Sequence, residues 1–225
     1  AIVLSVPSIW LPGLLSPMFP DAPPSLRALG DFVRKVFPPL AAYLLLARWV
    51  ERRTVTELAL RRMVPGLAIG LVGGMLLISA VFCVLWMAGA YQVRGWNGLQ
   101  DWLRTLLVIG VAPGVAEEII FRGVLYRLIA EVRGHVWALV VSALLFGGLH
   151  MGDPNASLWT SFAIAVEAGL LLGMVYAVSS SLWPCMGLHM AWNFLEGEFF
   201  GSPVSGVTIT GSALDATLAG PVWLT

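Results

Sequence analysis

Charged residues are scarce in this 225-residue chain. Only 12% of the residues are Asp, Glu, Lys or Arg, about half of the roughly 25% found in soluble domains. In contrast, 58% are hydrophobic and the mean hydropathy is +0.85, which is more apolar surface than a soluble domain can cover with polar groups. The composition therefore argues against an ordinary soluble enzyme and indicates an integral membrane protein.

The formal net charge of the chain is zero, because 13 basic residues balance 13 acidic ones. This balance favours neither a nucleic acid nor an acidic substrate as partner. No Lys or Arg follows Arg133, and the densest basic group lies between Arg48 and Arg62. By the positive-inside rule we expect that loop to face the cytoplasm. The two cysteines, Cys83 and Cys185, lie in apolar runs, so we expect no disulfide.

Strand-like alternation, internal repeats and low-complexity tracts are absent from the sequence. Six apolar segments take their place, at residues 36–50, 64–93, 105–130, 135–151, 158–178 and 182–200. Pro38 and Pro39 suit the start of the first helix, and five of the six segments are good candidates for spanning a bilayer. We predict an all-α, polytopic transmembrane helical bundle, with residues 1–225 forming a single domain.

Two further expectations concern the ends of the sequence. Residues 1–20 are apolar but interrupted by four prolines and lack a basic start, so we expect no cleavable signal peptide. Ala1 is not an initiator Met, and we allow for truncation at one or both termini.

Polar groups inside the apolar segments are the informative residues, because a charge at bilayer depth costs at least ~2.5–3.5 kcal/mol. Glu118 and Arg122 are four residues apart and share a helix face, which predicts an ion pair. Glu117 is turned about 100° away from that face. It has no partner on its own helix and is therefore a candidate general base.

Two histidine clusters lie on other segments. His150 follows two glycines at the end of one segment, and His189 and Asn193 are four residues apart on the last one. Glu117 and His150 each lie roughly 22 Å from the turn near residues 131–134, on neighbouring antiparallel helices, so we expect them to meet. A helix ion pair or a packing histidine explains each cluster singly, but the set on three spans favours a functional site.

These residues resemble the CAAX-protease and bacteriocin-processing (CPBP, or Abi) family of intramembrane proteases, which includes the Rce1-type prenyl-protein endopeptidases. The family pattern is E-E-x-x-x-R, then F-x-x-x-H, then H-x-x-x-N. The chain has Glu117-Glu118-x-x-x-Arg122, Phe146-x-x-x-His150 and His189-x-x-x-Asn193 in the same order. The resemblance covers residues 105–200, the motif-bearing core.

The resemblance implies a role for each motif residue. Glu117 activates a water for attack on a peptide carbonyl, while His150 and His189 orient that water or bind the oxyanion. Asn193 donates a hydrogen bond to the oxyanion or holds His189 in position. Glu118 and Arg122 brace the first span.

The resemblance leaves a metal cofactor open. Two histidines and a carboxylate, here His150, His189 and Glu117, can hold Zn²⁺ with a water in the fourth position. No H-E-x-x-H motif is present to support that reading, and a metal-free, glutamate-activated water is the other one. A divalent metal therefore counts as an option rather than a requirement.

Three further residues raise alternatives. Glu167 interrupts an apolar segment, and we expect it to face a cavity or a neighbouring helix rather than lipid. Glu196 lies on nearly the same face as His189 and Asn193; it either joins the site or marks the polar end of the helix. Cys185 as a nucleophile is disfavoured, because an apolar environment raises the pKa of a thiol.

The main hypothesis, which follows from the resemblance, is an intramembrane CAAX-type metalloendopeptidase of the CPBP family in a bacterial plasma membrane. It would act on lipidated tails, leader peptides or membrane proteins in a water-accessible cavity. One alternative is a non-catalytic protein for bacteriocin self-immunity or scaffolding. Another is a small transporter or proton relay that uses Glu117, Glu167 and the histidines, although no paired repeat supports transport.

Overall fold

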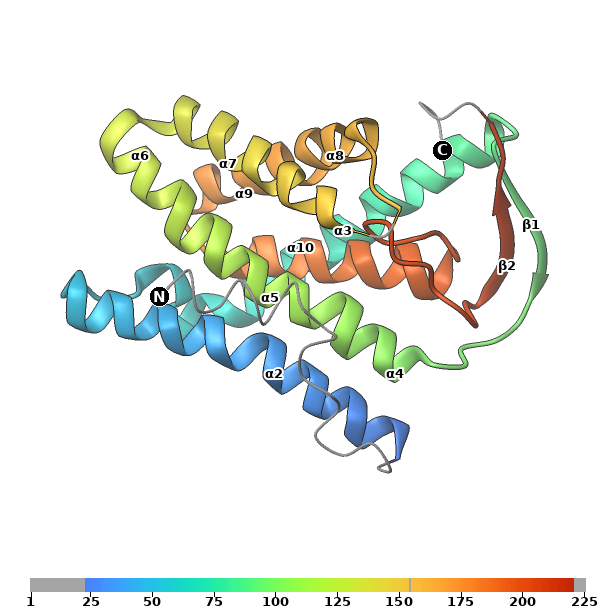
Figure 1. Cartoon of the computed structure of the whole chain (residues 1–225), viewed down its shortest axis with the longest axis horizontal. Coiled ribbons are helices and arrows are strands. Elements are labelled where there is room, and N and C mark those ends of the chain that lie inside the picture. Colours follow the sequence, from blue (N-terminus) through green and yellow to red (C-terminus); the bar gives the residue numbers. More distant parts are fainter. Residues whose placement is uncertain (1–22, 154, 221–225) are drawn as a thin grey trace.

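The computed structural model describes residues 23–153 and 155–220. Within these ranges the chain is a helical bundle with one small sheet at its edge (Figure 1), which confirms the predicted all-α membrane fold. The expectation about a signal peptide falls on residues 1–20, outside the described residues. The single-domain prediction stays a prediction.

The first helix, α2, spans Pro24–Leu45 and continues as the wider turn η1, Leu46–Val50. The sequence analysis placed Pro38 and Pro39 at a helix start, and this was wrong, because both lie inside α2. Pro24 takes the first helical position instead, where a missing N–H costs nothing. Two short turns, η2 (Thr56–Leu58) and η3 (Leu60–Arg62), lead to α3, Met63–Met87.

One continuous helix crosses the bundle from residue 102 to residue 133 (Figure 1). It consists of α4 (Trp102–Arg104), η4 (Thr105–Val111), α5 (Ala112–Glu118), η5 (Ile119–Tyr126) and α6 (Arg127–Arg133). Gly134 ends this helix with a φ of +84°, a conformation that glycine adopts without strain. The helix carries both glutamates and the arginine of the first motif at its middle.

The remaining helices form two hairpins. The elements are α7 (His135–Leu149), η6 (His150–Gly152), α8 (Leu158–Ile164), η7 (Ala165–Leu170), α9 (Leu171–Ser179), α10 (Leu182–Phe194) and η8 (Leu195–Phe199). Helix α10 packs backbone to backbone on α3: a Cβ atom at Gly70 would lie 2.2 Å from the Pro184 carbonyl oxygen, and one at Gly187 would lie 2.6 Å from the Leu67 oxygen. Small residues permit this approach, as they do in membrane helix pairs.

Three helices in the described part of the chain are long and apolar enough to cross a membrane, where the sequence analysis expected five. They are Leu60–Met87, His135–Gly152 and Leu158–Ser179. The central helix is interrupted by Glu117, Glu118 and Arg122, and the polar residues of α10 lower its hydropathy. The two helices that do not qualify carry the residues of the first and third motifs, whereas Phe146 and His150 lie on the candidate span His135–Gly152.

A two-stranded antiparallel sheet, β1 (Tyr91–Trp96) with β2 (Leu214–Leu218), closes one end of the bundle (Figure 1). The sequence shows no strand-like alternation, so these strands were not predicted. The start of β1 continues an apolar run, and its partner lies about 120 residues away in sequence. Tyr91 anchors the sheet, because its ring packs edge-on against Phe82 and its hydroxyl donates to the Phe200 carbonyl at 2.7 Å.

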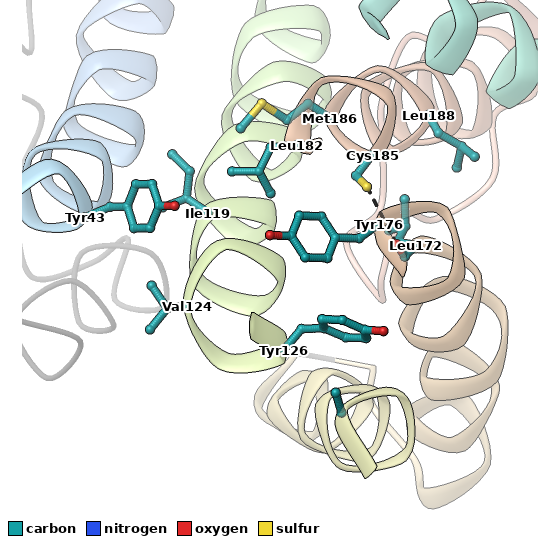
Figure 2. Packing of buried hydrophobic residues seen from close by; sticks show 11 residues of the cluster. Tyr43, Ile119, Val124, Tyr126, Leu172, Tyr176, Leu182, Cys185, Met186 and Leu188 are labelled. Atoms are coloured by element: carbon teal, nitrogen blue, oxygen red, sulfur yellow. Dashed lines mark hydrogen bonds between the residues drawn. The ribbon is translucent and has the colours of Figure 1, made fainter. Parts of the chain in front are cut away.

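The main core joins α2, the central helix, α9 and α10. Figure 2 shows Tyr43, Ile119, Leu172 and Met186 converging from these four helices. Cys185 lies in this core, with its thiol 3.6 Å from the Leu172 carbonyl oxygen. Both cysteines are free, which confirms the expectation of no disulfide.

Candidate functional site

The aromatic ring of Phe146 stands at the centre of the motif residues. It lies 4.9 Å from the ring of His150 and 6.2 Å from that of His189. The guanidinium of Arg122 lies 4.9 Å from its centroid, within range of a cation–π contact. The phenylalanine of F-x-x-x-H is thus the packing surface that brings the three motifs together.

A chain of charged hydrogen bonds crosses from the central helix to α10. Glu118 Oε1 accepts a hydrogen bond from Arg122 Nη1 at 3.0 Å, so the predicted ion pair is present. The same oxygen lies 2.8 Å from His189 Nδ1. Arg122 is fully buried and also donates to the carbonyl oxygens of Ala168 and Gly169. Glu118 therefore orients a site histidine as well as bracing its own helix.

Glu117 points to the other nitrogen of the same histidine. Its Oε2 lies 4.0 Å from His189 Nε2, and its side chain is 10% exposed. This separation exceeds a direct hydrogen bond but suits two groups that share a water. The two adjacent glutamates thus take different positions on His189, as the 100° offset between them predicts.

His150 and Asn193 flank this arrangement. His150 is buried, and its Nδ1 contacts the Phe146 carbonyl oxygen at 2.7 Å. Since a carbonyl only accepts, Nδ1 carries the proton. Asn193 lies one turn after His189, and its Nδ2 donates to the Ile109 carbonyl at 3.1 Å. The carboxylate of Glu118 likewise favours the His189 tautomer protonated on Nδ1.

A cavity of about 720 Å³ opens beside His189 and Asn193, and neither Glu117 nor His150 is among the residues that line it. His189 and Asn193 form part of its wall, together with residues of α8, η7 and β2. Glu167 and Glu196 also line it and lie close enough to interact electrostatically. Glu167 therefore faces a cavity, as expected, and Glu196 shares a wall with the site residues instead of only marking a helix end.

The arrangement does not favour a metal centre. No group of three or more His, Cys, Asp and Glu side chains within residues 23–153 and 155–220 is placed to hold a metal ion. The Nδ1 of His189 contacts Glu118, which leaves Nε2 as its only nitrogen for a ligand. The side chains of His150, His189 and Glu117 do not form a three-residue metal site in this structure.

Two residues that the sequence analysis did not single out lie near Glu117. Asp153 follows η6, and burial raises the pKa of its carboxyl, with His150 lowering it and Glu117 raising it. Lys35 comes from α2; its Nζ lies 3.4 Å from the Val108 carbonyl oxygen, and its charge interacts with Glu117. Asp153 could have been predicted as a site residue, because it follows the motif histidine by three residues. Nothing in the sequence predicts that Lys35 lies near the site.

The comparisons with known proteins agree with this geometry. Residues 99–195 match the family model described as type II CAAX prenyl endopeptidase Rce1-like. Neither the curated proteins nor the solved structures include a match to the chain. The matched segment contains Glu117, Glu118, Arg122 and both site histidines, and over these residues the chain is similar to the Rce1-like family of CAAX-type proteases.

Proposed function

We propose that this protein is an intramembrane endopeptidase in which Glu117 activates a water molecule for attack on a peptide carbonyl. The observation that carries the proposal is the placement of Glu117 Oε2 4.0 Å from His189 Nε2, while Glu118 holds the opposite nitrogen of that ring. A water in this position contacts a carboxylate base and an oriented imidazole together.

The reaction balances with the residues of this chain. Glu117 takes a proton from the water as its oxygen bonds to the carbonyl carbon, which gives a tetrahedral oxyanion. Asn193 has a second N–H besides the one donated to Ile109, and this N–H stabilises the oxyanion. The intermediate then collapses: the C–N bond breaks, and Glu117 returns the proton to the leaving amine.

His189 orients the attacking water. Its Nδ1 is engaged with the Glu118 carboxylate, so its Nε2 is an acceptor and takes one hydrogen of the water while Glu117 takes the other. The lone pairs of the water are thereby directed toward the substrate carbonyl. Oxyanion binding is assigned to Asn193, and His150, whose Nδ1 donates to the Phe146 carbonyl, is assigned to positioning through its ring contact with Phe146.

The cavity supports a peptide substrate presented from the bilayer. Its volume of about 720 Å³ falls within the range of sites that enclose most of a medium-sized ligand. CAAX-type proteases act on peptide or prenylated protein substrates in the membrane. We propose lipidated tails and membrane-protein segments as the substrate class.

The test is cleavage of quenched fluorogenic peptides, prenylated and unprenylated, by the protein in lipid nanodiscs. We expect Glu117→Gln to lower kcat by about 10²- to 10⁴-fold, as loss of a general base does. Glu131→Gln, an exposed glutamate on the same helix, is the matched control and should keep full activity. Equal activity of wild type and Glu117→Gln would sink the proposal and favour a non-catalytic scaffold.

A further inference from the structure

Strand β2 has one paired edge and one unpaired edge. Ala219 N donates to the Ala90 carbonyl, and Asn97 N donates to the Ala213 carbonyl. Because hydrogen-bonded and non-hydrogen-bonded pairs alternate in an antiparallel ladder, Thr217 also bonds to β1 through its partner Gln92.

The same alternation turns the other residues of β2 outward. Leu218 pairs with Tyr91, and Ala216 pairs with Val93, both at non-hydrogen-bonded positions. Their N–H and C=O groups therefore point away from β1. No backbone partner for these groups is present among residues 23–153 and 155–220.

The unpaired edge of β2 borders the cavity. Ala216, Thr217 and Leu218 all line it. Successive side chains of a strand point to opposite faces, so the cavity touches the backbone of β2 as well as the face that carries Ala216 and Leu218. Tyr91, the β1 partner of Leu218, lines the cavity too. Figure 1 shows β2 on the side of the sheet nearer the helices, with β1 outside it. His189 and Asn193 form part of the same cavity wall.

This edge has few of the features that protect edge strands from pairing. Lysine and other charges, proline and bulges serve that purpose in soluble proteins. The sequence of β2, LDATL, has no Lys or Pro and one exposed charge, Asp215, and the single irregularity in the sheet lies on β1, between Val93 and Gly95. A row of backbone donors and acceptors facing a cavity in an apolar protein needs partners, and an extended peptide supplies them.

We propose that the substrate peptide binds in extended form as a third strand, pairing its backbone with Ala216 and Leu218 at the free edge of β2. This inference rests on the proposed proteolytic function and adds its substrate-binding mode. Both strands lie outside the segment that matches the family, residues 99–195. Main-chain pairing makes recognition tolerant of side-chain sequence, so specificity would rest on the side-chain contacts of the cavity and on any lipid group.

The first arm of the test replaces Ala216 with proline. Ala216→Pro removes an outward N–H and leaves the hydrogen bonds to β1, as proline on an edge strand can. We expect KM to rise about three- to tenfold, the worth of about one hydrogen bond, with kcat within twofold of wild type. Leu214→Pro is the matched control, since its N–H also points outward but Leu214 does not line the cavity, and it should leave KM unchanged.

The second arm uses wild-type protein, so it does not depend on a variant that folds. The peptide cleaved fastest is resynthesised with one N-methyl group at each backbone position in turn. We expect KM to rise at alternate positions, because only every second residue of the added strand faces β2. Uniform or absent effects, together with a normal KM for Ala216→Pro, overturn the third strand while cleavage itself persists. Failure of wild type to cleave any peptide overturns both proposals.

Discussion

The buried guanidinium of Arg122 connects three parts of the site. It pairs with Glu118, donates to two carbonyl oxygens of η7 and lies over the ring of Phe146. A buried charge is costly unless it is paired, so removing either Arg122 or Glu118 would leave the remaining charge buried without compensation. The arginine of the first motif is therefore a positioning residue that acts on the reaction through Glu118 and His189.

We expect Arg122→Met to lower the free energy of unfolding by about 3–5 kcal/mol, because it leaves the Glu118 carboxylate buried without its cation. Unfolding by SDS in mixed micelles, followed by circular dichroism, measures the change. The double variant Arg122→Met/Glu118→Gln removes both charges and should recover part of the loss. A double variant less stable than the single one would contradict this explanation.

The variant Glu118→Gln tests whether Glu118 orients the ring of His189, separately from its effect on the stability of the fold. The amide keeps the shape of the side chain but weakens a charge-assisted bond to His189 Nδ1. We expect kcat to fall more than tenfold with KM little changed, because the ring of His189 is held less firmly in the orientation that places Nε2 toward Glu117. An unchanged kcat in a stably folded Glu118→Gln protein would contradict the positioning role.

A pH-dependent contribution to stability comes from Glu51, at the end of the bundle away from the sheet. Burial opposes its ionisation, but hydrogen bonds from Arg53 and Arg127 outweigh burial and hold the pKa below its ordinary value of 4.5. A carboxyl with a lowered pKa stabilises the folded state above the unfolded pKa and loses that effect as pH falls through the folded one.

We therefore expect the midpoint temperature of unfolding to be steady above pH 4.5 and to fall below it, with a smaller fall in Glu51→Gln. Thermal unfolding of both proteins between pH 3 and 7 checks this. Glu131→Gln serves as control, because Glu131 is 57% exposed and exposed pairs contribute little. Parallel curves for wild type and Glu51→Gln would refute the assignment.

At the scale of elements, the contact between α3 and α10 decides where His189 lies. Gly70 and Gly187 bring the two backbones together without side chains between them. We expect Gly70→Ala to destabilise the fold and lower activity, because its Cβ would lie 2.2 Å from the Pro184 oxygen. Gly73→Ala, on the same helix with no atom within 4 Å of the new Cβ, should be neutral or slightly stabilising. Thermal unfolding and peptide cleavage are measured on both variants.

The sequence predicted what local spacing determines. The Glu118–Arg122 pair follows from a separation of four residues on one helix, and the bundle follows from the length and apolarity of the segments. The link between Glu118 and His189 spans 71 residues, and it depends on which helices become neighbours, which spacing alone does not state. The same holds for the pairing of β1 with β2 and for the approach of Lys35 from α2.

At the scale of the whole molecule, the arginine-rich loop and the sheet lie at opposite ends of α3. Arg127 also pairs with Glu51 at the loop end, which adds a basic residue there. By the positive-inside rule we expect this end to be cytoplasmic.

Cysteine labelling in cells tests the orientation. In a background with Cys83→Ala and Cys185→Ala, a cysteine introduced by Thr54→Cys should react with an impermeant maleimide only after permeabilisation. One introduced by Gln100→Cys should react in intact cells. Both positions are exposed, so a reversed pattern would show that the protein is inserted in the opposite orientation.

Glycine contacts form two tightly packed units on either side of the cavity, and the Glu118–His189 and Arg122–Gly169 hydrogen bonds join the units at the site. One unit is α3 with α10; in the other, Gly147 and Gly169 hold α7 against α8 and η7, with a Cβ at Gly147 only 2.2 Å from the Ser161 oxygen. The cavity lies between α10 and the α8–η7 segment. We expect each unit to move as a rigid body, so that the gap widens by pivoting while the contacts inside each unit persist. A bifunctional cross-link between Ala163→Cys and Trp192→Cys in that cysteine-free background should then block cleavage of large substrates, and the same link made with a long, flexible reagent should not.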